Sequence, residues 1–144
     1  MANPDPRLYA SEELNRRIIE AMHAGLVHVS ADGTIQQANG EALRILGLTF
    51  DELTQRYTRD FEMDTIWEDG SSCPVADYPV TKALTTGQAQ PPATIGVRRP
   101  DGDISWSIYT AVPVMAAGGE VTGAVVTLLD ITERKRAEEV RRAL

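Results

Sequence analysis

The residue types that most often carry out catalysis are scarce in this chain. Its only histidines are His23 and His28, and its only cysteine is Cys73. A Ser/His/Asp or Cys/His arrangement would need one of these histidines in a cleft. By strand alternation, His28 lies on the opposite sheet face from Val27 and Val29, so we expect it at the surface or beneath a helix. A lone cysteine provides neither a disulfide framework nor a cysteine-based metal site. We therefore predict no catalytic and no metal site.

The overall composition is typical of one globular domain with a modest core. The chain has 144 residues, of which 42% are hydrophobic and 24% charged. A formal net charge of −7 argues against general binding to nucleic acid or to anionic membranes. No apolar run is long enough to span a bilayer, and the first ten residues lack the layout of a secretory signal. We therefore expect a cytoplasmic protein without nucleic-acid or membrane partners.

Helical and strand patterns then divide the chain. We expect residues 1–10 to form a flexible tail and residues 11–24 an amphipathic helix, with Leu14, Ile18 and Met22 on one face. A hairpin with an Asp-Gly turn follows, then short helices, and the last third reads as a three-stranded meander.

Five strands with helices grouped between them indicate an α+β domain around one antiparallel sheet. Residues 124–129 are nearly continuous in apolar and β-branched types, as expected of a central strand that is covered on both faces. Placing this strand beside the first one in the middle of the sheet gives the strand order 2-1-5-4-3.

Several segments, taken in order, resemble a PAS domain. The opening of a PAS domain is matched by GLVHVSADGTIQQANGEALRILGLTFDEL, and the rest of it is matched, in the right order, by YPVTKALTTG, RRPDGDISW, TAVPV and VTGAVVTLLDITERKRAEE. The resemblance covers about Leu14 to Glu139, and the Asp-Ile-Thr followed by a charged helix is its most specific part. It implies a five-stranded sheet of the same order with helices on one face, and a PAS core over residues 25–131. It also implies a module that senses a ligand, light or redox state, or that mediates dimerisation.

The junction after the last strand is the expected signal relay, formed by Asp130, Ile131 and Thr132. The side chains of Asp130 and Thr132 can satisfy backbone donors at the turn and at the helix start. The helix of residues 132–144 offers only a narrow apolar line at heptad spacing, made of Ala137, Val140 and Leu144. This line suits a second copy of the helix, so we predict the start of an output coiled coil. A capped helix that packs on its own sheet is the alternative.

The resemblance also implies where a cofactor would be held. Haem-binding PAS sensors with a histidine ligand place it on the helix before the third strand, and here YPVTKALTTG has none. Flavin photosensors use a cysteine in an Asn-Cys-Arg motif, whereas Cys73 lies in Ser-Ser-Cys-Pro. We therefore predict no haem or flavin, with a haem held by Met63 or a non-covalent flavin beside Trp67 as alternatives.

Matching the hairpin to the PAS pattern places a set of candidate pocket residues on the concave side of the sheet. Gln36 would be the polar anchor, the small Ala38 would leave space, and Leu43 and Val80 would be neighbouring walls. An ordinary packed core uses the same residue types, so a filled core stays open as the alternative. The candidates are Val27, Val29, Gln36, Ala38, Leu46, Leu84, Ile95, Val97, Trp106 and Ile108.

Together these features predict a cytoplasmic PAS sensory or relay domain of a larger signalling protein, a sensor histidine kinase or a cyclase. Its partners would be a small-molecule ligand, a downstream output domain in cis, and a second copy bound through the two terminal helices. A ligand-free dimerisation module is one alternative. A small α+β enzyme is another, but it would need a buried acid/base pair, and the candidate pocket residues include no Asp, Glu or His. The expected dimer contacts are Leu14, Ile18, Met22, Ala137, Val140 and Leu144.

Overall fold

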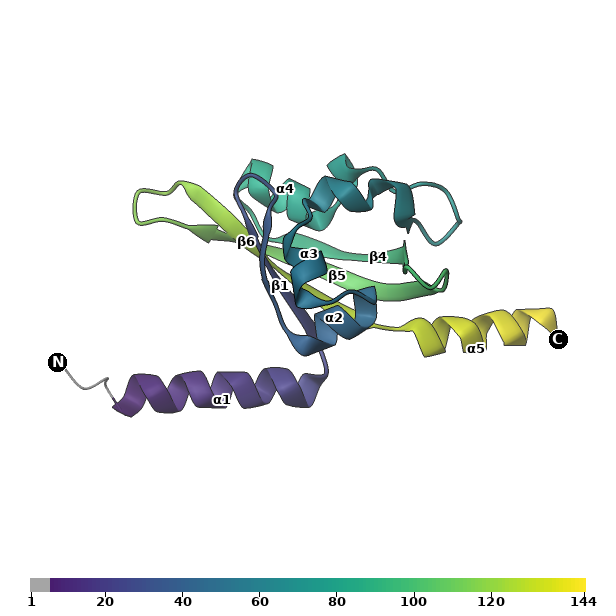
Figure 1. The fold of residues 1–144 in the computed structure, drawn as a ribbon, viewed down its shortest axis with the longest axis horizontal. Helices are drawn as coiled ribbons and strands as arrows, with labels where there is room; N and C mark the ends of the chain where they lie inside the picture. Colours follow the sequence, from purple (N-terminus) through teal and green to yellow (C-terminus); the bar gives the residue numbers. More distant parts are fainter. Residues whose placement is uncertain (1–5) are drawn as a thin grey trace.

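A computed structural model of the chain describes residues 6–144 (Figure 1). Helices α2, α3 and α4 pack on a curved antiparallel sheet, and the terminal helices α1 and α5 extend away from this body. The elements are α1 (Pro6–Met22), β1 (Gly25–Ser30), β2 (Ile35–Ala38), α2 (Gly40–Leu46), α3 (Phe50–Thr54), β3 (Thr65–Ile66), α4 (Pro79–Thr86), β4 (Gln90–Arg98), β5 (Ile104–Met115), β6 (Val121–Asp130) and α5 (Thr132–Ala143), with 3-10 helices at Thr58–Asp64 and Val75–Asp77.

The sheet has the predicted topology with one short strand added. Its order is β2-β1-β6-β5-β4-β3, so the five longer strands follow the predicted order. Strand β3 pairs with β4 at the edge, where Thr65 lies opposite Val97 and Ile66 opposite Gly96. A strand of two residues is too short for an alternation pattern, which is why the sequence analysis did not predict it.

Helix α1 begins earlier than the sequence predicts. It starts at Pro6 rather than Ser11, so residues 6–10 are helical and not a tail, while residues 1–5 of the expected tail lie outside the described residues. Proline suits the first helical position, and Glu13 pairs with Arg16 at 2.6 Å and with Arg17 at 3.0 Å along the helix. The helix ends at Met22 because His23 adopts a left-handed conformation, with φ of 52°.

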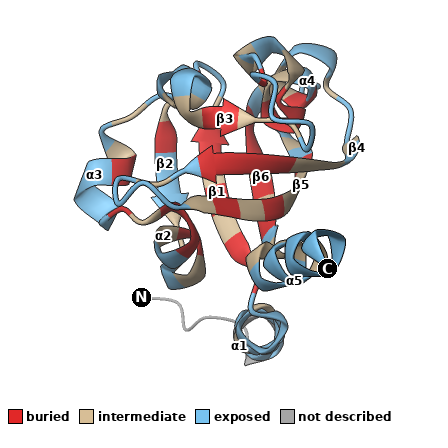
Figure 2. Ribbon diagram, turned by 90° about the vertical axis from the view of Figure 1, so that its right-hand side faces the viewer, coloured by how far each residue is buried: buried red, intermediate tan, exposed pale blue. Residues whose placement is uncertain are grey.

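The core lies between one face of the sheet and helices α2, α3 and α4. Figure 2 shows the buried residues gathered in the strands and in the helix faces turned toward them, whereas α1 and α5 are largely exposed. From Ala124 onward, burial alternates along β6: Ala124, Val126 and Leu128 are buried, whereas Leu129 is 47% exposed. The sheet therefore has an inner face covered by the chain's own helices and an outer face that carries exposed apolar side chains.

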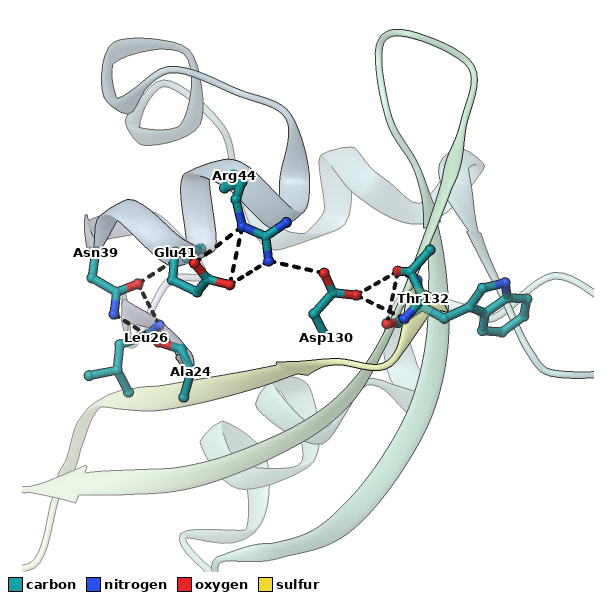
Figure 3. A network of polar contacts seen from close by, with 9 residues as sticks. Ala24, Leu26, Asn39, Glu41, Arg44, Asp130 and Thr132 are labelled. Atoms are coloured by element: carbon teal, nitrogen blue, oxygen red, sulfur yellow. Dashed lines mark hydrogen bonds and ion pairs between the residues drawn. The ribbon is translucent and has the colours of Figure 1, made fainter. Parts of the chain in front are cut away.

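Asn39 fixes the start of α2 against β1. Its side-chain oxygen accepts hydrogen bonds from the backbone N–H of Ala42, at 3.0 Å, and of Leu26, at 2.9 Å. Its amide nitrogen donates to the carbonyl of Ala24 at 3.0 Å (Figure 3). One side chain thus caps α2 and holds the segment that joins α1 to β1.

Candidate sensory cavity and relay junction

A cavity of about 90 Å³ lies between the inner face of the sheet and the helices. Five of the predicted pocket residues line it: Val27, Val29, Leu46, Ile95 and Val97. Val80, predicted as a neighbouring wall, also lines it. The sequence-based set missed the other residues, which come from strands β2, β3, β5 and β6, from the start of α4 and from the Thr58–Asp64 helix. These are Ile35, Thr58, Phe61, Thr65, Tyr78, Pro79, Tyr109, Val126 and Leu128.

The prediction that Gln36 anchors a ligand is wrong, because its side chain is exposed. Strand β2 contains a bulge: His28 pairs with Gln37, but Val29 pairs with Ile35, which leaves Gln36 as the extra residue. A bulge shifts the alternation of side chains by one position. Ile35 therefore enters the cavity in place of Gln36.

The predictions for Trp106 and Ile108 are also wrong, because β5 has the opposite phase. Ser105 and Ser107 are 4% and 0% exposed on the inner face, so Trp106 and Ile108 project from the outer face. Gly96 of β4 leaves room there, since a Cβ at Gly96 would lie 3.0 Å from the Trp106 ring. We assigned the larger apolar residues to the inside, and the structure places the hydroxyl-bearing ones there.

Two further candidates lie near the cavity without lining it. Ala38 is half-buried against the core, as is the expected wall residue Leu43. Leu84 lines a separate surface hollow, with Thr81 and Tyr57. Of the ten predicted pocket residues, the structure thus brings five together around one space.

The polar groups of the cavity are all hydroxyls. Thr65 donates a hydrogen bond to the carbonyl of Cys73 at 2.9 Å, and the hydroxyl oxygens of Thr65 and Tyr78 are 2.6 Å apart. The hydroxyl oxygen of Tyr109 is buried and has no hydrogen-bond partner among the described residues. Burial raises the pKa of Tyr78 to about 12, and it raises the pKa of Tyr109 as well. Both phenols are therefore protonated at neutral pH and can donate.

The relay residues form a compact network at the end of β6 (Figure 3). The Asp130 carboxylate accepts hydrogen bonds from the backbone N–H of Thr132 at 2.9 Å and from its hydroxyl at 2.6 Å. The Thr132 hydroxyl in turn accepts from the backbone N–H of Trp106 at 2.9 Å. The N–H of Ile131 donates to the Trp106 carbonyl at 2.8 Å. The start of α5 is thus bonded to both β5 and β6.

Arg44 of α2 joins the same network, which the sequence did not predict. Its guanidinium donates to the second Asp130 oxygen at 3.0 Å and is held by Glu41 one turn earlier (Figure 3). Burial raises the pKa of Asp130, but the hydrogen bonds from Thr132 and the pairing with Arg44 outweigh it and hold the pKa below its ordinary value. Asp130 is therefore a carboxylate that connects α2 to the β6–α5 junction.

Lys135 adds a second attachment between α5 and the domain body. Its ammonium lies 5.3 Å from the centre of the Trp106 ring and pairs with Glu68 of the loop after β3. Beyond this turn, Ala137, Val140 and Leu144 are exposed. In α1, Leu14, Ile18 and Met22 are 59%, 47% and 61% exposed. The predicted dimer residues are thus uncovered in the single chain.

The remaining reactive side chains do not form a second site. Cys73 is fully buried, and burial together with nearby Asp77 raises the pKa of its thiol to about 11, so it stays protonated. His28 is half-buried. Within residues 6–144, histidine, cysteine and acidic side chains do not gather in a group that could hold a metal ion. Over the same range, each helix is too short or too polar to cross a membrane.

The cavity, the sheet order and the relay junction define a PAS domain, and comparison with known proteins agrees. The model of the PAS fold family matches residues 19–136, so the chain belongs to this family. PAS domains are sensory modules rather than catalytic ones, and they commonly dimerise and lie in cis with output domains.

Individual proteins to which the chain is similar include signalling proteins. The chain is 29% identical over 135 residues to the alginate biosynthesis sensor protein KinB of Pseudomonas aeruginosa, covering 92% of this chain but only 20% of KinB. A PAS domain from Colwellia psychrerythraea has a TM-score of 0.63 at 16% identity, over 84% of this chain and 97% of that one. A sensory box histidine kinase/response regulator from Burkholderia thailandensis has a TM-score of 0.59 at 21% identity, over 89% and 92%.

Proposed function

We propose that this chain is the cytoplasmic sensory domain of a larger sensor histidine kinase. In this proposal a small molecule in the cavity changes the position of α5 relative to the domain through Asp130. The observation that carries the proposal is the Asp130 network, because it bonds the end of β6 to β5, to α2 and to the first residue of α5.

The path from cavity to junction is short. Val126 and Leu128 line the cavity and lie on the strand that ends at Asp130. Tyr109, which also lines the cavity, pairs with Leu128 across β5 and β6. A molecule that fills the cavity therefore contacts the strand whose next inward-facing residue is Asp130. Because packed cores respond to a change of volume by small shifts of whole elements, such contact would bias the position of α5.

The kinase context rests on the relatives. KinB is a sensor protein, and the chain spans 20% of its length, which leaves room for an output domain in the corresponding parent protein. The polar character of α5 suits a linker that continues into such a domain. A cytoplasmic location agrees with an unpaired thiol at Cys73.

The proposal includes a parallel homodimer. Leu14, Ile18 and Met22 form an apolar stripe on α1 that the chain's own sheet leaves uncovered. In Figure 2, α1 and α5 both lie below the sheet, and in Figure 1 their axes run in a similar direction, with α1 toward the left end of the molecule and α5 toward the right end. A two-fold axis beside them would let each helix meet its twin. Helix α5 has 12 residues, which is marginal for a coiled coil alone, so α1 would supply most of the association energy.

The relay is tested in the full-length parent with the variant Asp130→Ala. We expect the kinase output to lose its dependence on the signal while the domain stays folded, because the variant removes the contacts of α5 with α2 but leaves the core intact. Glu133→Ala is the matched control, since it removes an exposed carboxylate from the first turn of the same helix. Normal regulation in Asp130→Ala, or equal disruption in Glu133→Ala, would contradict the proposal.

A ligand-free dimerisation module is the second candidate, favoured by the exposed stripe on α1 alone. In this second candidate the cavity would have no ligand. Substituting larger side chains for its lining residues would then leave the output unchanged, which would not be so for a ligand-binding sensor.

A further inference from the structure

Residues 65–73 form a short hairpin at the edge of the sheet, which we call the edge hairpin. The backbone N–H of Cys73 donates a hydrogen bond to the carbonyl of Thr65 at 3.0 Å. Nearer the turn, the N–H of Trp67 donates to the carbonyl of Ser71 at 2.8 Å. These cross-strand bonds make the segment a rigid arm rather than an open loop.

The base of the edge hairpin belongs to the cavity wall. Thr65 is 4% exposed and lines the cavity, and its hydroxyl donates to the carbonyl of Cys73 at 2.9 Å. The hydroxyl oxygen of Tyr78, another lining residue, lies 2.6 Å from the hydroxyl oxygen of Thr65. A change in the packing of this wall therefore acts directly on the base of the hairpin.

The tip of the edge hairpin, residues 68–70, contacts the output helix. Glu68 pairs with Lys135, whose side chain is only 17% exposed and whose ammonium lies 5.3 Å from the centre of the Trp106 ring. The ring can lie across β4 because Gly96 has no side chain, since a Cβ there would approach the ring to 3.0 Å. Lys135 is thus held between a carboxylate of the hairpin and an aromatic ring of the sheet. Base and tip are three residues apart, which is about 10 Å in an extended strand.

Each of the two contacts of Lys135 is weak by itself. An ion pair with one exposed partner and a cation–π contact near the surface each change an equilibrium about two- to fivefold. Helix α5 has 12 residues, none of them buried, and isolated helices of this length are marginal. Contacts of this size can therefore decide how often α5 is attached to the domain body, and they can break without unfolding the core.

We propose that the edge hairpin is a second relay arm, which carries a change at the cavity wall to α5 through Glu68 and Lys135, alongside the Asp130 junction. The inference rests on the proposed sensory function and adds Glu68 as a positioning residue for the output helix. The junction ties α5 to α2, and the arm ties it to the β3 edge of the sheet. The two attachments thus come from different parts of the fold.

Hydrogen exchange of the α5 backbone amides, measured on the 144-residue chain, tests the arm, because a helix that detaches more often exchanges faster. Gly70→Ala strains the turn of the edge hairpin, where φ is 88°, and a Cβ there would meet no atom within 4 Å. Gly102→Ala is the matched control, because Gly102 has φ of 91° and equally open surroundings in the turn between β4 and β5. In that turn Arg99 pairs with Asp101. We expect Gly70→Ala to raise the exchange rates of α5 about two- to fivefold and Gly102→Ala to leave them unchanged.

Substitutions at the contact itself separate charge from shape. Glu68→Gln and Lys135→Met should each raise the exchange rates of α5, and the double variant should not exceed Lys135→Met alone, because both remove the same pair. Lys135→Arg keeps a cation over the ring and should exchange like the wild type. Asp69→Asn removes the neighbouring charge of the tip, which is bonded to Ser71 rather than to α5, and should have no effect.

Thr65→Val tests transmission from the base of the arm. It removes the hydroxyl in the cavity wall and should shift the amide NMR signals of α5 when the hairpin is intact, but not in the Glu68→Gln background. Equal shifts in the two backgrounds, equal exchange in Gly70→Ala and Gly102→Ala, or no effect of Glu68→Gln would overturn the proposal.

The test does not depend on the folding of one variant. If Thr65→Val failed to fold, the two glycine variants and Glu68→Gln would still decide, because all three positions are exposed. These measurements involve no output domain, so their failure is distinguishable from a failure of the sensory function, which is measured on kinase output.

Discussion

Leu128 and Leu129 are neighbours in β6, yet they face opposite sides of the sheet and opposite environments. Leu128 is 1% exposed and lines the cavity, whereas Leu129 is 47% exposed, with Val112 and Val114 of β5 also exposed on the outer face. The inner face is covered by α2, α3 and α4, and the outer face is not covered by any comparable layer among the described residues. The comparison indicates that the packing of helices on the inner face stabilises the fold. The apolar residues of the outer face therefore remain available for contacts between chains.

The largest expected effect comes from truncating the inner leucine. Leu128→Ala should lower the free energy of unfolding by about 2–5 kcal/mol, because it removes a buried side chain and enlarges the space beneath the helices. Leu129→Ala is the matched control and should change it by less than about 1 kcal/mol. Urea unfolding followed by circular dichroism measures both. Similar losses in the two variants would contradict the distinction between the faces.

The second prediction concerns association through exposed apolar side chains. Ile18→Glu combined with Met22→Glu should raise the dimer dissociation constant by about a hundredfold, equivalent to about 2.7 kcal/mol, because charged groups would enter the interface between the two α1 helices. Sedimentation or light scattering gives the oligomeric state. The variant should unfold like the wild-type monomer, compared at concentrations low enough to dissociate the wild-type dimer, since α1 is exposed in the single chain. A wild-type chain that is monomeric at high micromolar concentration would contradict the proposed dimer.

A smaller effect is expected at the junction. Asp130→Ala should lower the free energy of unfolding by about 1 kcal/mol, as for a lost capping hydrogen bond. The variant removes the acceptor for Thr132 and the long-range partner of Arg44. The folded-state pKa of Asp130 is lowered, so its contribution is complete above its unfolded-state value of about 3.9 and is lost as the pH falls through the folded-state value. The difference between wild type and variant should therefore be constant near neutral pH and shrink in acid. A difference that grew in acid would show that the carboxylate form is not the stabilising one.

The smallest expected effect is the difference in stability between variants of the two cavity tyrosines. Tyr78→Phe removes the hydrogen bond to Thr65 and should cost about 1 kcal/mol. Tyr109→Phe removes a hydroxyl without a partner and should leave stability within about 0.5 kcal/mol of wild type or raise it slightly. Thermal unfolding of the two variants, measured side by side, checks this. A larger loss in Tyr109→Phe would mean that its hydroxyl is already hydrogen-bonded in the unliganded domain.

The parts of the fold that the sequence predicted are those with strong local patterns. The continuous apolar run of residues 124–129 correctly indicated the central strand, and the change from apolar to charged residues at Asp130 indicated where α5 begins. The early start of α1 at Pro6 was missed because the apolar stripe begins only at Leu14, so residues 6–10 carry no helical periodicity to reveal it.

The cavity was predicted only in part because its wall depends on register. A single extra residue in β2 turned Gln36 outward, and hydropathy cannot reveal a bulge. In β5 either alternating set of side chains could face the core, since one set contains Trp106 and Ile108 and the other contains Tyr109. Apolar character alone therefore could not decide which set points inward. Arg44 was missed for a different reason: it is 86 positions from Asp130, and only the folded chain brings them together.

The position of Lys135 over the ring of Trp106 gives the domain a built-in optical reporter. Indole emission depends on the polarity and charge around the ring, and here the ammonium of Lys135 in α5 lies 5.3 Å from the ring centre. If that helix shifts, the ammonium leaves the ring and the emission of Trp106 changes without any label. The chain has one other tryptophan, Trp67, so Trp67→Phe would leave Trp106 as the single tryptophan, whose emission follows the position of α5 in real time.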